Sequence, residues 1–161
     1  MRPTLMLLFS LLLLSIQQTP DPESGKVLLV RATGAQQSAR VCQVMQGENR
    51  LANLSNQEAV LLELPAGNQM LQTRIKKGTV LGSSILVHPG AYSFYELKLY
   101  KSRGLLPSSG YRFRIVPLSP KRLYVFLRDE DWLRRDLGAE EYAQLCRMLK
   151  VEPAVGRKDA Y

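Results

Sequence analysis

Residues 41–75 read VCQVMQGENRLANLSNQEAVLLELPAGNQMLQTRI, and this stretch decides the fold class. Short apolar runs alternate here with segments rich in Gly, Asn, Ser and Pro. Gly and Asn tolerate positive φ angles, and proline cannot donate to a sheet ladder, so these segments mark turns between short strands. The stretch therefore predicts strands at residues 40–46, 50–54, 59–64 and 69–76.

The same pattern continues on both sides of this stretch. Upstream, KVLLVRA at 26–32 has four apolar residues in a row, which indicates a strand buried on both faces. Downstream, YRFRIV at 111–116 alternates, so Phe113 and Ile115 should point inward, with Tyr111, while Arg112 and Arg114 point outward. Further strands are predicted at 80–87, 92–100 and 123–127. About 8–9 short strands at this spacing predict a mainly β fold, an antiparallel β-sandwich.

The C-terminal part of the chain changes character. Residues 129–136 resemble the start of a helix with acidic residues in its first turn. Residues 139–150 place Tyr142, Leu145, Cys146 and Leu149 at helical spacing, which predicts an amphipathic helix packed on the sheet. In a chain of 161 residues, we expect one domain at 25–151 and a flexible tail at 152–161.

The N-terminus indicates the compartment. Residues 5–16, LMLLFSLLLLSI, are apolar or small, and the polar QQTPDPES follows at once. A membrane-spanning helix needs about 20 apolar residues, so the run predicts a secretory signal peptide with its lead-in at 1–24. The protein should then be secreted or periplasmic, and an uncleaved anchor stays open as an alternative. No cysteine ends the run, which argues against a bacterial lipid-modified N-terminus.

The chain has two cysteines, Cys42 and Cys146, near the two ends of the predicted domain. In an exported protein a disulfide between them is expected, and its long loop would contribute about 4 kcal/mol in the chain-entropy model. The alternative is two unpaired buried thiols.

Basic residues outnumber acidic ones, 22 to 14, which favours association with anionic surfaces. Basic and aromatic side chains interleave on the later strands and should share one exposed face if residues 92–100 pair with residues 111–116. This candidate site consists of Lys98, Tyr100, Lys101, Arg103, Arg112 and Arg114. We expect a protein partner or an anionic envelope polymer, with peripheral membrane contact as an option; export argues against nucleic acid. The alternative is a solvated face whose cations protect a sheet edge.

Catalytic signatures are sparse in the sequence. The single histidine, His88, lies in a predicted turn, and neither a G-x-S-x-G elbow nor a phosphate-binding G-x-x-x-x-G-K-S/T loop occurs. One histidine and two distant cysteines do not form a zinc motif. We therefore expect no catalytic residues, no cofactor and no metal. A hydrolase using His88 or the acidic cluster of Asp129, Glu130 and Asp131 is the less favoured alternative.

Three segments suggest a family. The GEN turn at 47–49, LANL at 51–54 and VLLELPAG at 60–67 resemble PEGA-type β-domains and a related uncharacterised family of bacterial envelope proteins. HPGAYSFYEL at 88–97 resembles an aromatic strand of that second family, so the similarity covers roughly residues 26–100. The resemblance implies a small non-enzymatic β-sandwich that acts as an adhesive or accessory module in the periplasm or at the cell surface. A structural or chaperone-like subunit of an envelope assembly, docking through its C-terminal helix, is the alternative function.

Overall fold

The computed structural model describes residues 23–32, 40–75, 80–101 and 111–151. The predicted leader, the loops and turn at 33–39, 76–79 and 102–110, and the predicted tail at 152–161 lie outside these ranges. Within the described ranges, no helix is both long and apolar enough to cross a membrane.

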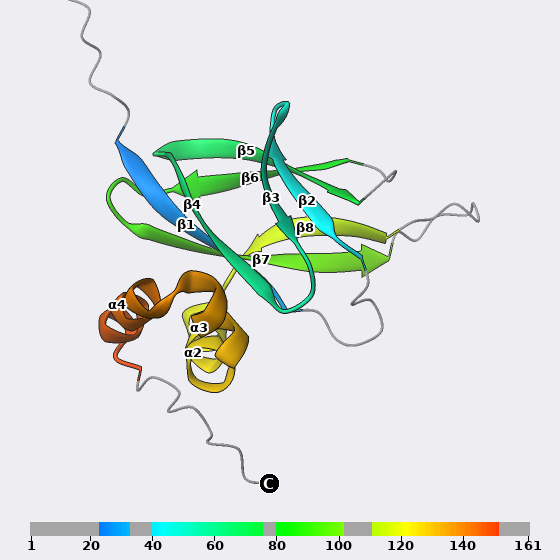
Figure 1. Ribbon diagram of the computed structural model, residues 1–161. Coiled ribbons are helices and arrows are strands. Elements are labelled where there is room, and N and C mark those ends of the chain that lie inside the picture. Colours follow the sequence, from blue (N-terminus) through cyan, green and yellow to red (C-terminus); the bar gives the residue numbers. More distant parts are fainter. Residues whose placement is uncertain (1–22, 33–39, 76–79, 102–110, 152–161) are drawn as a thin grey trace, which may run out of the picture.

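The described strands form two four-stranded sheets that face each other (Figure 1). Sheet A has the order β4 (Glu58–Pro65), β1 (Ser24–Arg31), β7 (Tyr92–Lys101) and β8 (Tyr111–Pro117). Sheet B has the order β3 (Asn49–Leu54), β2 (Cys42–Gln46), β5 (Gly67–Ile75) and β6 (Leu81–Val87). The first eight predicted strands are all present, with bounds within two residues of the prediction, and β1 begins inside the predicted lead-in.

One pairing departs from the predicted antiparallel pattern. β1 pairs antiparallel with β4 but parallel with β7, from Lys26 opposite Tyr92 to Val30 opposite Glu96. Parallel neighbours need a long crossover connection. The chain from β2 to β6 supplies it: β2 and β3 lie in sheet B, β4 in sheet A, and β5 and β6 in sheet B again. Turn signals report only on neighbouring strands, so this long-range pairing was not visible in the sequence.

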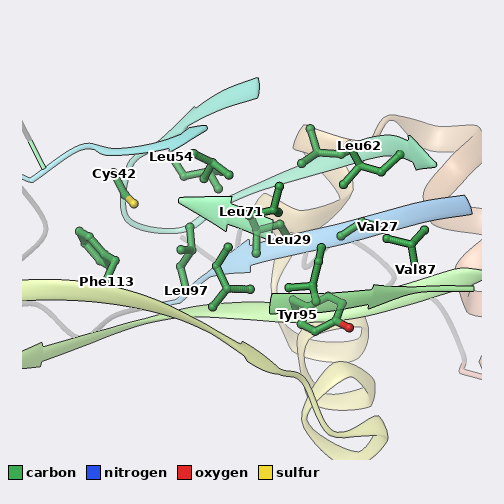
Figure 2. Close-up of a cluster of buried hydrophobic side chains, with 14 residues drawn as sticks. Val27, Leu29, Cys42, Leu54, Leu62, Leu71, Val87, Tyr95, Leu97 and Phe113 are labelled. Atoms are coloured by element: carbon green, nitrogen blue, oxygen red, sulfur yellow. The ribbon is translucent and has the colours of Figure 1, made fainter. Parts of the chain in front are cut away.

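β1 is buried on both faces, as its unbroken apolar run predicted. Val27 and Leu29 point into the cluster between the sheets, which we call the inter-sheet core (Figure 2). Leu28 and Val30 point to the opposite side and join a second cluster beneath the helices, the helix-side core. All four side chains have no exposed surface, so the fold has three layers with sheet A in the middle.

Three helices form the third layer, on the outer face of sheet A (Figure 1): α2 (Pro120–Asp129), α3 (Asp131–Leu137) and α4 (Ala139–Leu149). The strand predicted at 123–127 is wrong, because this segment lies within α2. Leu123, Phe126 and Leu127 are buried at helical spacing, while Tyr124 and Val125 between them are exposed. Ser119 accepts a hydrogen bond from the backbone N–H of Arg122 and Pro120 begins the helix, a cap that the sequence contained.

The predicted amphipathic helix is present as α4, but the predicted disulfide is absent. Cys42 lies in the inter-sheet core and Cys146 in the helix-side core, so sheet A separates the two thiols and both are free. Burial raises the pKa of Cys42 to about 12, and burial also raises the pKa of Cys146. Both side chains are therefore protonated, apolar core residues at neutral pH.

Hydrogen bonds across the sandwich fix the edge strand β8. The Thr73 hydroxyl of β5 donates to the carbonyl of Phe113 at 2.6 Å, and the hydroxyl of Ser83 in β6 accepts from the backbone N–H of Ile115 at 3.3 Å. Both contacts use backbone groups that an edge strand would otherwise leave open. β8 is thus hydrogen-bonded to sheet B as well as to β7 of its own sheet. These contacts hold in place the strand that carries the outward side chains.

Candidate functional site

The pairing of β7 with β8 gathers four of the predicted site residues. Lys98 is directly opposite Arg114, and Tyr100 is directly opposite Arg112. The guanidinium carbon of Arg114 lies 5.8 Å from the centroid of the Tyr100 ring. We call Lys98, Tyr100, Arg112 and Arg114 the arginine face; the predicted strand pairing and its shared face are confirmed for these four.

Alternation along the two strands determines which way the arginine face points. Phe113 and Ile115 of β8, together with Leu97 of β7, are buried in the inter-sheet core. The residues between them must therefore project from the opposite face of sheet A. Arg112 and Arg114 are exposed there, and Tyr100 retains 45% of its surface. The burial of apolar residues on the inner face of sheet A thus determines that the basic side chains project from its outer face.

Glu96, which the sequence reasoning missed, borders the arginine face on the same side of β7. It is only 2% exposed, and its carboxylate accepts from the guanidinium of Arg122 in α2 at 2.7 Å. The Lys98 ammonium lies 3.8 Å from the second carboxylate oxygen. The sequence signal for Glu96 was its position on the outward face of residues 92–100, between aromatic and basic residues. The negative charge of Glu96 offsets the positive charge of Lys98, but no ion pair within the described ranges includes Arg112 or Arg114.

The two remaining predicted members are not placed. The backbone of Lys101 pairs with that of Tyr111 at the end of β7, but its side chain is outside what the structure describes. Arg103 lies wholly outside the described ranges. Their membership of the arginine face stays a prediction.

The residues considered for hydrolytic chemistry have ordinary structural surroundings. His88 is exposed directly after β6. At the junction of α2 and α3, Asp129 pairs with Arg128 at 2.7 Å, and Glu130 accepts from the indole N–H of Trp132 at 2.7 Å. In the part of the chain that the structure describes, no three His, Cys, Asp or Glu residues are grouped to hold a metal ion.

A second polar cluster, also missed from sequence, joins α4 to sheet A. The ammonium of Lys26 lies 3.0 Å from the carboxylate of Glu141, which also accepts a hydrogen bond from the Tyr92 hydroxyl. The hydrogen bond from Tyr92 is the largest cause of a lowered pKa of Glu141, and the contacts with Lys26 lower this pKa further. The hydrogen bond to Glu141 raises the pKa of Lys26. The residues come from three distant segments, so no local pattern could have revealed them. We call this cluster the α4 latch.

The α4 latch borders a polar pocket of about 220 Å³ that is also lined by Ser24, Glu63 and Gln144. The apolar stripe of α4, including Tyr142 and Leu145, is already used in the helix-side core. Gln144, Arg147 and Met148 remain on its exposed side. Docking of a partner through this helix stays a prediction.

Comparison with known proteins adds no functional information. No family model matches the chain, and no curated protein matches it. The resemblance to PEGA-type domains therefore stays a prediction.

Proposed function

We propose that the protein is an exported, non-enzymatic β-sandwich domain that binds an anionic partner of the cell envelope through the arginine face. One observation carries the proposal: Arg112 and Arg114 are exposed on one face of one strand, and within the described ranges neither has an acidic partner. Guanidinium groups bind carboxylate and phosphate oxygens bidentately, which makes them suited to oxyanion ligands.

The cross-strand arrangement favours a ligand over a merely solvated surface. Lys98 lies directly opposite Arg114, and like charges in that relation destabilise a sheet. Glu96 offsets the charge of Lys98 only in part, because it also binds Arg122. A bound anion would relieve the remaining repulsion, so the arrangement is better suited to the bound state than to the free state.

Two sequence features support the location. The apolar run at 5–16 and the polar segment after it have the layout of a signal peptide. The resemblance to PEGA-type domains also favours the periplasm or the cell surface.

Charge reversal tests the proposal. The double variant Arg112→Glu plus Arg114→Glu is compared with Arg74→Glu plus Arg147→Glu, which changes two exposed arginines on β5 and α4 and gives the same net charge. Binding to dextran sulfate is measured by titration at several salt concentrations. We expect the first variant to weaken binding about ten-fold more than the second, with a shallower salt dependence. Equal weakening by the two variants would show that only net charge matters, and the proposal would be wrong.

A further inference from the structure

The arginine face forms the floor of a step in the molecular surface. Its side chains project from the same face of sheet A as Phe94, which packs under the helices, and Glu96, which binds Arg122 of α2. β7 and β8 run on past the helical layer (Figure 1), and the ion pair of Arg122 with Glu96 marks the border of that layer on β7. A helix with its side chains is about 10 Å across. A linear ligand can lie along this floor, beside the helical layer.

An aromatic ring lies among the cations of this floor. Tyr100 is directly opposite Arg112, and the Arg114 guanidinium lies 5.8 Å from its ring centroid. Arg112 and Arg114 are separated by two residues of extended strand, about 6.8 Å. The floor thus offers two oxyanion sites next to a half-exposed aromatic surface. Polyanion binding by charge alone would not require the ring.

We propose that this step binds a linear acidic polysaccharide, with carboxylates of its uronic acid units on Arg112 and Arg114 and one sugar ring on Tyr100. Carboxylates match the guanidinium geometry, and the C–H face of a sugar ring packs on an aromatic side chain. The inference rests on the proposed function and narrows its anionic partner to one chemical class.

The test separates the aromatic contribution from charge. Polygalacturonate is titrated by calorimetry into the protein, Tyr100→Ala and Tyr100→Phe. Tyr124→Ala is the matched control, because Tyr124 on α2 is 40% exposed and also has an arginine guanidinium 5.8 Å from its ring. We expect Tyr100→Ala to weaken binding about ten-fold, with Tyr100→Phe and Tyr124→Ala within two-fold of the parent. Circular dichroism verifies that each variant is folded.

Other ligands serve as competing outcomes. Titrations with poly(dT) and with vesicles of phosphatidylcholine and phosphatidylglycerol test nucleic acid and membrane binding. Tighter binding of either one than of polygalacturonate overturns the inference. Equal polygalacturonate affinity of Tyr100→Ala and the parent also overturns it, while the charge-reversal experiment still decides the proposed function on its own. If the Arg112 and Arg114 reversals leave polygalacturonate and dextran sulfate binding unchanged, both proposals are wrong.

Discussion

Neighbouring leucines of β1 should be equally important to stability although they belong to different cores. Leu29 faces the inter-sheet core and Leu28 faces the helix-side core, and neither has exposed surface. Leu28 is paired with Leu61 and Phe94, and Leu29 with Val60 and Tyr95. In a simple two-layer sandwich, one of two consecutive residues would face solvent, and its truncation would matter little.

Truncation of either leucine to alanine should cost about 2–5 kcal/mol in the free energy of unfolding. This range is typical of fully buried leucines, because both the transfer free energy and the residual cavity contribute. A domain of this size has a total stability of about 5–15 kcal/mol, so either truncation removes a large part of the total. With an urea m-value of about 2 kcal/mol/M, a loss of 3 kcal/mol lowers the unfolding midpoint by roughly 1.5 M.

Urea unfolding followed by two probes measures these losses. Trp132, the single tryptophan of the chain, is 8% exposed in α3, so its fluorescence reports the helical layer. Far-UV circular dichroism reports the whole backbone. Leu86→Ala is the control, because Leu86 is 45% exposed on β6 and its truncation should cost within about 0.5 kcal/mol. If Leu28→Ala costs no more than Leu86→Ala, the helices do not pack on β1 as described.

Two further predictions concern the thiols and the α4 latch. Because both thiols are buried and free, they should not react with a water-soluble disulfide reagent at pH 8 in the native protein, but both should react in denaturant. Reductant should have no effect on stability. Reaction of only one thiol, or of none, in denaturant would contradict this. Glu141 has a lowered pKa when folded, so its contribution is present above its unfolded pKa of about 4.3 and lost as the pH falls through the folded value. Glu141→Gln should therefore flatten the loss of thermal stability between about pH 5 and pH 3, whereas Glu140→Gln, at an exposed neighbouring position, should not; identical profiles for the two variants would refute the latch.

The predictable part of the fold rests on local signals. Turn residues separated the first eight strands, and the unbroken apolar run of β1 indicated burial on both faces. Alternation in β8 placed Arg112 and Arg114 outward, and this fixed most of the candidate site. These patterns work because periodicity and turn conformation are set by residues adjacent in the chain.

The errors have two physical origins. The segment at 123–127 is too short and too uniformly apolar for periodicity to distinguish strand from helix, and the Ser119 cap was the better signal. The cysteine pairing and the parallel partner of β1 depend on contacts between distant segments. Export does not determine whether two cysteines share a core, and sheet A lies between these two.

The location of the arginine face follows from the extent of the helical layer. Along one face of β7, Phe94 packs in the helix-side core, Glu96 binds the flank of α2, and Lys98 and Tyr100 project beyond it. Polarity thus changes along a single strand face at the point where the helices end. Buried charge requires a partner, so the boundary residue Glu96 pairs with Arg122, while Arg112 and Arg114 beyond it are exposed. A longer helical layer would have required apolar residues at these positions and left no arginine face.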